Sequence, residues 1–211
     1  MKQKPSRWGA AVPVPEEQYQ AKRQALIRQA GMAFSRLGYH NTSLDDVAKA
    51  LHVTKTALYY YVKDKNEILY ECFNLALDIA EQAMAEAQAR HGRAIDRIRG
   101  FIVRYIQVTN SELGDFAVVS EPLTSLHAPE REKIQKRKRS FDSKLRKWVA
   151  QAIADGDVAD ESPAVIVSFL MGAIIHIRKW YEPEGPLSVD EIAQRFARLI
   201  SFGICAGRTD P

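Results

Sequence analysis

The chain has 211 residues, enough for one small module and one medium-sized core, and its 30 Lys and Arg exceed its 26 Asp and Glu by four. Few glycines and prolines, long helical periods and no strand-length alternation of period two exclude a β-rich protein and favour an all-α fold. The sequence shows no secretory signal and no apolar run of about 18 residues, so we expect a cytoplasmic protein with no membrane partner. Cys72 and Cys205 lie far apart in the sequence, so we expect both to be free thiols.

The first 19 residues differ from the rest of the chain. They contain three prolines and the basic residues Lys2, Lys4 and Arg7, with no helical period, which predicts a flexible basic arm over residues 1–19. A disordered tail and a DNA-contacting arm are both open readings. Residues 1–65 carry 11 Lys and Arg against 5 Asp and Glu, so the positive charge of the protein is concentrated there, as expected of a phosphate-binding surface.

A first helix is predicted from Gln20, where apolar residues recur on one face as far as Leu37 and Gly38 can end the helix. Ser43 and Asp46 then have the spacing of a capping box, which predicts the start of a second, short helix.

A third helix follows after a short turn, with Thr54 as its expected N-cap and Leu58 and Val62 facing inward. Its outward face is polar and comprises Lys55, Thr56, Tyr59 and Tyr60. Two short helices joined by such a turn, with a polar outer face on the second, have the geometry that fits the major groove of DNA.

Six longer helices are predicted in the remainder, which makes about nine in all. Asp64 and Glu67 repeat the capping-box spacing and open the fourth helix. The other five cover residues 93–109, 112–126, 129–155, 162–181 and 188–206, with Pro122 expected to bend or interrupt the second of them. Pro163 after Ser162, and Ser188 with Glu191, are start signals for the last two.

The N-terminal region resembles the signature of the TetR family of bacterial transcriptional regulators. The resemblance covers about 45 residues and is carried by Ala30, Phe34, Gly38, the run from Thr42 to Ala48 and the run from Val53 to Lys65. The sequence departs from the family at two positions. His52 stands where the turn usually has Gly, which requires a positive φ, and Val62 stands where most relatives have Phe.

The resemblance implies a helix-turn-helix DNA-binding domain over residues 20–66 and a ligand-binding and dimerisation domain over residues 67–211. It implies a homodimer that a small effector releases from operator DNA. The residues that match family positions contacting the DNA backbone are Thr42, Ser43, Thr54, Tyr59 and Lys65; those able to reach base edges are Lys55, Thr56 and Tyr60, and Ala57 is small enough for close approach to the groove. Helix packing is the alternative role for the three tyrosines 59–61.

The segment from Ala164 to Ile177 is almost continuously apolar, so it must be covered on all sides. In the resembling family the last two long helices pair with those of a second copy as a four-helix bundle. We therefore expect a homodimer through residues 162–181 and 188–206, in which Gly172 permits close helix approach.

The effector is the most open part of the interpretation. The run from Trp180 to Ser188 is similar to that of family members that respond to acyl-CoA thioesters, and the basic residues in 131–147 could bind the CoA phosphates, a solvated helix face being the alternative. An aromatic or cationic drug-like effector, or a DNA-binding protein without an effector, are the other readings. Candidate ligand contacts are Phe101, Tyr105, Phe116, Phe141, Trp148, Phe169, His176, Arg178 and Trp180.

We expect neither an enzyme nor a resident metal or cofactor. The five histidines are scattered without metal-ligand spacing, and the sequence shows no nucleophile elbow and no glycine-rich phosphate loop.

Overall fold

A computed structural model describes residues 16–90, 92–111, 114 and 121–204. Within them the chain forms α-helices and one short 3-10 turn and no strand, which confirms the all-α prediction. The elements are α1 (Glu16–Leu37), α2 (Leu44–Ala50), α3 (Lys55–Leu58), α4 (Lys65–Gln88), α5 (Ala94–Thr109), η1 (Leu123–Ser125), α6 (Ala128–Ala154), α7 (Pro163–Trp180) and α8 (Val189–Ile204).

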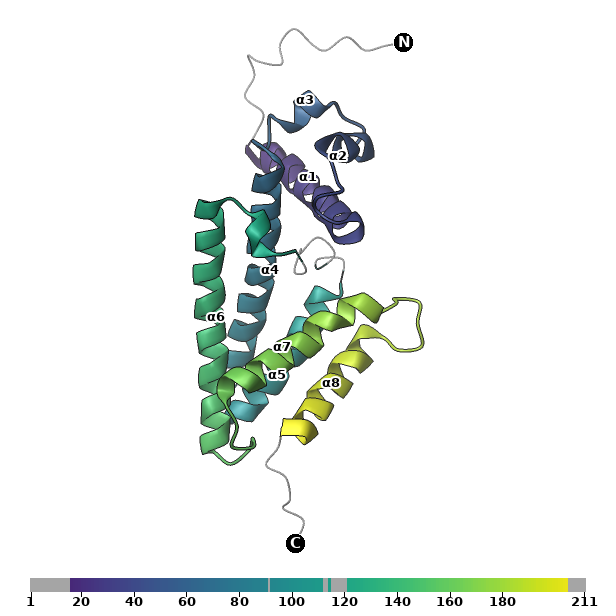
Figure 1. The fold of residues 1–211 in the computed structure, drawn as a ribbon. Coiled ribbons are helices and arrows are strands. Elements are labelled where there is room, and N and C mark those ends of the chain that lie inside the picture. The colour runs from purple at the N-terminus through teal and green to yellow at the C-terminus, as the bar shows by residue number, and fades with distance from the viewer. Residues whose placement is uncertain (1–15, 91, 112–113, 115–120, 205–211) are drawn as a thin grey trace.

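The first three helices and the start of α4 form a head around one apolar cluster (Figure 1). Leu26 and Phe34 of α1, Val47 of α2 and Leu58 of α3 are buried in it. The local signals explain the tight connections. Ser43 and Asp46 form the reciprocal capping box at α2, and Thr54 Oγ1 accepts a hydrogen bond from the N–H of Ala57 at 3.2 Å.

Both turns of the head use the left-handed region of backbone conformation. Gly38 has φ +87° directly after α1, and His52 has φ +55° between α2 and α3. The positive φ expected at His52 is therefore confirmed, at a position where a non-glycine residue is uncommon.

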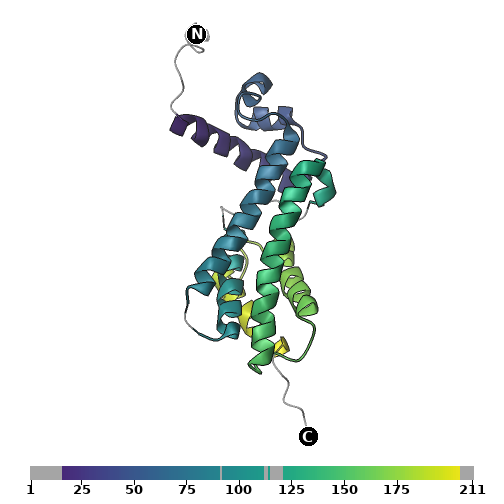
Figure 2. The same cartoon turned by 90° about the vertical axis from the view of Figure 1, so that its left-hand side faces the viewer.

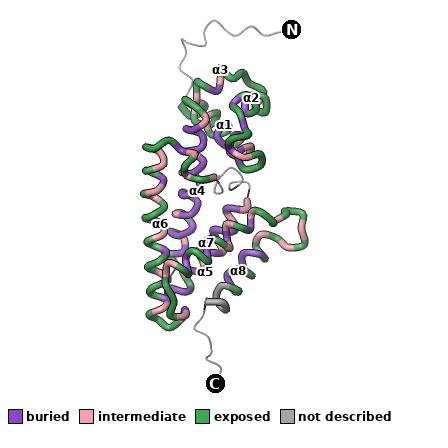
Figure 3. The backbone as a smooth tube through the Cα atoms, viewed as in Figure 1, coloured by how far each residue is buried: buried purple, intermediate pink, exposed green. Residues whose placement is uncertain are grey.

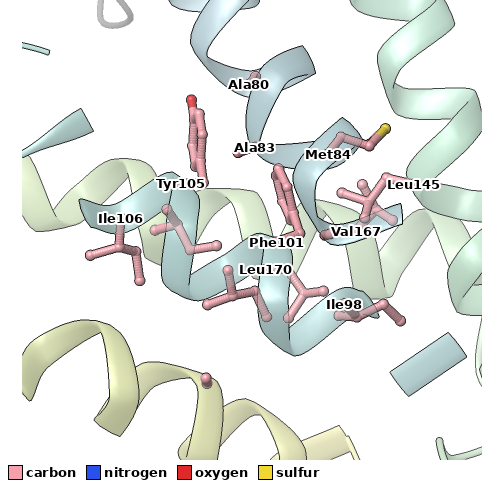
Figure 4. Close-up of a cluster of buried hydrophobic side chains, with 14 of the residues drawn as sticks. Ala80, Ala83, Met84, Ile98, Phe101, Tyr105, Ile106, Leu145, Val167 and Leu170 are labelled. Carbon is pink, nitrogen blue, oxygen red and sulfur yellow. The ribbon is translucent and has the colours of Figure 1, made fainter. Parts of the chain in front are cut away.

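Helices α4 to α8 form the body, and α4 connects it to the head. Figures 1 and 2 show α4 and α6 side by side along the molecule, with α5, α7 and α8 at the end away from the head. Burial follows this arrangement, since α4 is largely buried while α6 has a continuous exposed side (Figure 3). The body core includes Ile98, Phe101 and Ile102 of α5 (Figure 4).

Three sequence predictions about elements need correction. The arm was expected through residue 19, but α1 already begins at Glu16, where Glu16 and Glu17 in its first turn favour the helix N-terminus. Residues 121–126 are not α-helical as expected, because Pro122 has an extended ψ of 138° and only the 3-10 turn η1 follows. The remainder of the expected 112–126 helix falls outside the described residues except for position 114, as do Cys205 and Phe116.

The third correction concerns α7. By length and composition its 18 residues could cross a membrane, with a mean hydropathy of 1.3, which the sequence analysis did not detect. Ile166, Leu170 and Ile174 on its inner side are nonetheless buried in the body core. The helix is thus a core helix with one face that the described residues leave exposed.

Candidate DNA-binding face and effector cavity

The polar residues of α3 lie on the surface of the head. Lys55 and Thr56 are exposed, Tyr59 is 50% exposed and Tyr60 62% exposed, whereas Leu58 and Val62 are buried, as the sequence predicted. Two neighbouring tyrosines with this exposure present both ring surface and hydroxyl groups to a partner. Ser43 and Thr54 at the starts of α2 and α3 are also exposed, so both helices begin with a solvent-accessible hydroxyl group.

An ion pair joins α2 to α3 on this surface. Nζ of Lys55 lies 2.7 Å from Oδ2 of Asp45, with both side chains about half exposed. The hydrogen bond from Lys55 to the Asp45 carboxylate raises the pKa of the lysine, which therefore stays cationic. Any further acceptor that approaches Lys55 therefore competes with the Asp45 carboxylate for its ammonium.

Thr42 and Lys65 are less accessible than the other predicted DNA contacts. Thr42 is buried, and its hydroxyl donates to the carbonyl oxygen of Gly38 at 3.0 Å, so the side chain holds the loop after α1. The ammonium of Lys65 lies 4.1 Å from the centre of the Tyr39 ring, and burial lowers its pKa. Ala57, the small residue expected to allow close approach to the groove, is half-buried.

Tyr19 belongs to this surface and was missed by the sequence analysis. Its ring centre lies 5.7 Å from that of Tyr60 and 5.1 Å from that of Tyr61. The first turns of α1 therefore support the aromatic residues that follow α3. The sequence assigned Tyr19 to the basic arm, so no helical face suggested the contact.

The body contains a cavity of about 250 Å³ between α4, α5, α6 and α7. Tyr105 and Phe141 line it, so two of the candidate ligand contacts come together as predicted. Phe101 does not line the cavity itself, but its ring stacks on that of Tyr105 at a centroid distance of 5.4 Å (Figure 4). The other lining residues are Phe73, Ala76, Leu77, Ala80, Ile134, Lys138, Asp142, Val167, Ser168, Met171 and Ile175.

The remaining candidate ligand residues lie elsewhere. Trp148 borders a separate shallow groove between α4 and α6, and Phe169, His176 and Trp180 are exposed on the outside of α7. Arg178 donates hydrogen bonds to the carbonyl oxygens of Thr109 and Gly114, so it holds the end of α5. These five side chains, Trp148 on α6 and four on α7, were chosen for residue type, which does not determine the direction in which a side chain on a helix points.

The basic segment of α6 is only partly free to bind anions. Arg137 binds Asp78 at 2.7 Å and Glu81 at 2.9 Å on α4, and Arg146 binds Asp142 at 2.7 Å. Lys138 is exposed at the edge of the cavity and forms no ion pair with any carboxylate of the described residues. Lys138 is therefore the cation available to a ligand there, since Arg146 already compensates the neighbouring carboxylate.

A polar joint connects the head to the body, again without a sequence signal. Asn66, buried in the first turn of α4, donates from Nδ2 to the carbonyl oxygen of Ser125 at 2.7 Å. Its Oδ1 accepts from the backbone N–H of His127 at 3.1 Å. The start of α6 is thus fixed to the start of α4.

No group of three or more potential metal-ligating side chains occurs in the part of the chain that the structure describes.

A compact helix-turn-helix head joined through one long helix to a helical body with an open-mouthed cavity defines a one-component DNA-binding regulator. Two family profiles match this chain: "Bacterial regulatory proteins, tetR family" over residues 26–72 and "Tetracyclin repressor-like, C-terminal domain" over residues 91–204. The chain belongs to the TetR family, whose members bind operator DNA, dimerise and bind small-molecule effectors.

Individual relatives agree over nearly the full length. The chain is 26% identical to the uncharacterized HTH-type transcriptional regulator YhgD of Bacillus subtilis, covering 88% of this chain and 97% of YhgD. The ketosteroid transcriptional regulator KstR2 of Mycobacterium tuberculosis has the same fold, with a TM-score of 0.80 at 19% identity over 88% of this chain and 96% of that one. AibR, solved in complex with isovaleryl coenzyme A and operator DNA, has a TM-score of 0.76 at 24% identity, covering 84% of this chain and 97% of AibR. These relatives are transcriptional regulators or share their fold, which supports a regulator rather than an enzyme.

Proposed function

We propose that the protein is a cytoplasmic homodimeric repressor that releases its operator when the acyl or aryl group of a CoA thioester enters the cavity of the body. The observation that carries this proposal is an apolar cavity with one uncompensated cation, Lys138, at its edge. In this proposal residues 20–66 read DNA and residues 67–211 bind the effector and the second copy. Residues 16–19, which were assigned to the arm, are part of α1 and belong with the DNA-binding domain.

The volume of the cavity favours a small acyl or aryl group. Ligand sites usually enclose about 300–1,000 Å³, and the cavity volume of about 250 Å³ lies just below that range. A whole CoA molecule does not fit inside, so its phosphates must lie outside. AibR, a protein of the same fold, binds isovaleryl coenzyme A, which has a short branched acyl group.

Charge at the edge favours an anion over a cation. Asp142 also borders the cavity, but its carboxylate is bound to Arg146. Lys138 is exposed, as are Lys136 and Arg139 close to it in the sequence of α6, although these two do not line the cavity. A CoA phosphate would form charge-assisted hydrogen bonds there. A cationic drug-like effector, the second candidate, would meet repulsion at the same edge.

Two helices that line the cavity could couple effector binding to the orientation of the DNA-binding head. Ala76 and Ala80 on α4 and Phe141 on α6 line the cavity, and the same two helices are fixed to each other near the head through Asn66. A ligand that binds more tightly at one separation of α4 and α6 favours the head orientation that goes with that separation. The free energy of this shift cannot exceed the difference between its binding free energies for the two states. A 100-fold loss of operator affinity needs a coupling of about 2.7 kcal/mol.

The uncovered side of α7 is the proposed dimer face. Val165, Phe169, Gly172 and His176 recur at helical spacing on it, all exposed, and a Cβ at Gly172 would meet nothing within 4 Å. On α8, Leu199 is 65% exposed. A second copy packed on α7 and α8 removes these side chains from water and fixes the spacing of two heads, which must match half-sites about one helical turn apart.

The test is to identify what the purified protein carries and whether the cavity holds it. Native mass spectrometry of protein from its host should show a CoA thioester bound to the wild type. Ala80→Phe should abolish that adduct while operator binding persists, and Ala150→Phe, on the exposed side of α6, should retain it. A thioester adduct that survives Ala80→Phe would contradict the proposed site.

A further inference from the structure

Asp45 is a carboxylate on a surface that meets a polyanion. It lies in the first turn of α2, about half exposed, and its one ion pair among the described residues is with Lys55 at 2.7 Å. The helix does not need Asp45 as a cap, since Asp46 already supplies both hydrogen bonds of the capping box. The position of Asp45 therefore requires an explanation other than helix initiation.

Stability does not provide that explanation. Exposed ion pairs contribute little to folding, because both charges are well solvated and two flexible side chains must be ordered. On the DNA-binding face the same carboxylate has a larger effect. Every phosphate that approaches competes with Asp45 for the ammonium of Lys55 and is itself repelled by the carboxylate.

We propose that Asp45 determines specificity by holding Lys55 away from phosphates, so that Lys55 contributes to binding only where a base edge offers it acceptors. This inference rests on the proposed DNA-binding face of α3. A lysine ammonium is a flexible point charge that binds any phosphate, whereas guanine O6 and N7 offer a fixed pair of acceptors in the major groove. Asp45 therefore opposes binding of Lys55 to phosphate, which does not depend on sequence, on every duplex.

The proposal predicts effects of neutralising Asp45 that loss of general repulsion between its carboxylate and DNA would not produce. With Asp45 neutralised, Lys55 becomes free to bind phosphate on any duplex, so affinity for random DNA rises. The plot of log affinity against log salt concentration should also become steeper, by the slope that about one additional phosphate contact contributes. Affinity for the selected duplex changes less. The ratio of the two affinities should fall about tenfold, the effect of one base contact.

The experiment is a double-mutant cycle on the full-length dimer with Asp45→Asn, Lys55→Ala and both together. The probes are a duplex that the wild type selects from a random pool and a scrambled duplex, each titrated from about 50 to 200 mM salt. Glu17→Gln is the matched control, since it removes one exposed carboxylate from the head without a lysine partner among the described residues. Thermal unfolding verifies that all variants are folded.

Asp45→Asn should reduce the affinity ratio about tenfold in the wild-type background and leave it unchanged when Lys55 is Ala, and Glu17→Gln should not alter the ratio. An unchanged ratio in Asp45→Asn, or an equal reduction with and without Lys55, overturns the proposal. Failure of the wild type to select any duplex would instead contradict the DNA-binding face itself, so the two failures are distinguishable.

Discussion

Asn66 on α4 and His127 at the start of α6 are joined by a hydrogen bond of 3.1 Å from the backbone N–H of His127 to Oδ1 of Asn66. The amide group of Asn66 also donates to Ser125, so one buried side chain fixes the approach to α6 at the base of the head. The head therefore cannot tilt with α4 without moving the start of α6 or breaking these bonds.

Asn66→Ala should destabilise the protein by about 1–3 kcal/mol, because it leaves a backbone donor and a backbone acceptor unsatisfied. It should also weaken the dependence of operator affinity on effector, which titration of the protein–operator complex measures. Asn41→Ala removes an exposed amide bonded to Leu37 within the head and should leave effector response intact. Equal effector response in Asn66→Ala and the wild type would contradict the role of this joint.

Tyr19→Leu should weaken operator binding although Tyr19 was not among the predicted DNA contacts. Loss of the ring removes the support on which Tyr60 and Tyr61 pack, and aromatic pairs of this kind contribute about 0.5–1.5 kcal/mol beyond their buried area. Operator affinity should fall about two- to tenfold. Tyr70→Leu, on α4 and outside this aromatic group, serves as the comparison, and equal losses in both variants would argue against a specific role for Tyr19.

Phe169→Glu and Leu199→Glu should each yield folded monomers, because these side chains are 58% and 65% exposed and a charge on an apolar interface is strongly unfavourable. Sedimentation velocity at low micromolar concentration measures the change. Arg139→Glu, on the exposed side of α6, should stay dimeric. Ile174→Glu is not a test of the interface, since Ile174 is buried in the monomer core and its variant should unfold. A dimeric Phe169→Glu, Leu199→Glu double variant would show that the interface lies elsewhere.

Stability should decline at alkaline pH through two buried groups. Burial raises the pKa of Cys72 from 9.0 to about 12 and that of Tyr105 from 10.0 to about 12. Because the folded-state pKa is raised, the contribution of each group is intact below its unfolded pKa, about 9 for Cys72 and about 10 for Tyr105, and is lost as pH rises toward 12. Denaturant unfolding between pH 8 and 11 should show a shallower decline for a Cys72→Ala, Tyr105→Phe double variant than for the wild type. Parallel curves would refute this assignment.

The sequence predicted the head in detail because its signals are local. The capping box of Ser43, the cap of Thr54 and the positive φ of His52 each depend on residues within a few positions along the chain. Pro122 was expected to bend or interrupt the predicted 112–126 helix, and it is extended in the structure, so the break was predicted; that only the 3-10 turn η1 follows it was not.

The cavity could not be predicted as well, because it depends on which faces of four helices meet. Tyr105 and Phe141 were identified, but Arg178, chosen as a ligand contact, satisfies carbonyl oxygens at the end of α5. Lys138 was seen only as one charge in a basic run. Arg137 is paired with two carboxylates of α4 and Lys138 is not, and this difference depends on tertiary packing that residue spacing in the sequence does not reveal.

Titration of CoA thioesters into the protein–operator complex, with the matching free acids as controls, tests the central claim most directly. DNA release followed by fluorescence anisotropy should occur with a short-chain or aryl thioester, far more weakly with its free acid, and not with the thioester when Ala80 is replaced by Phe. Release by an uncharged or cationic aromatic compound, with no response to any thioester, would contradict the account and favour a drug-like effector for the same cavity.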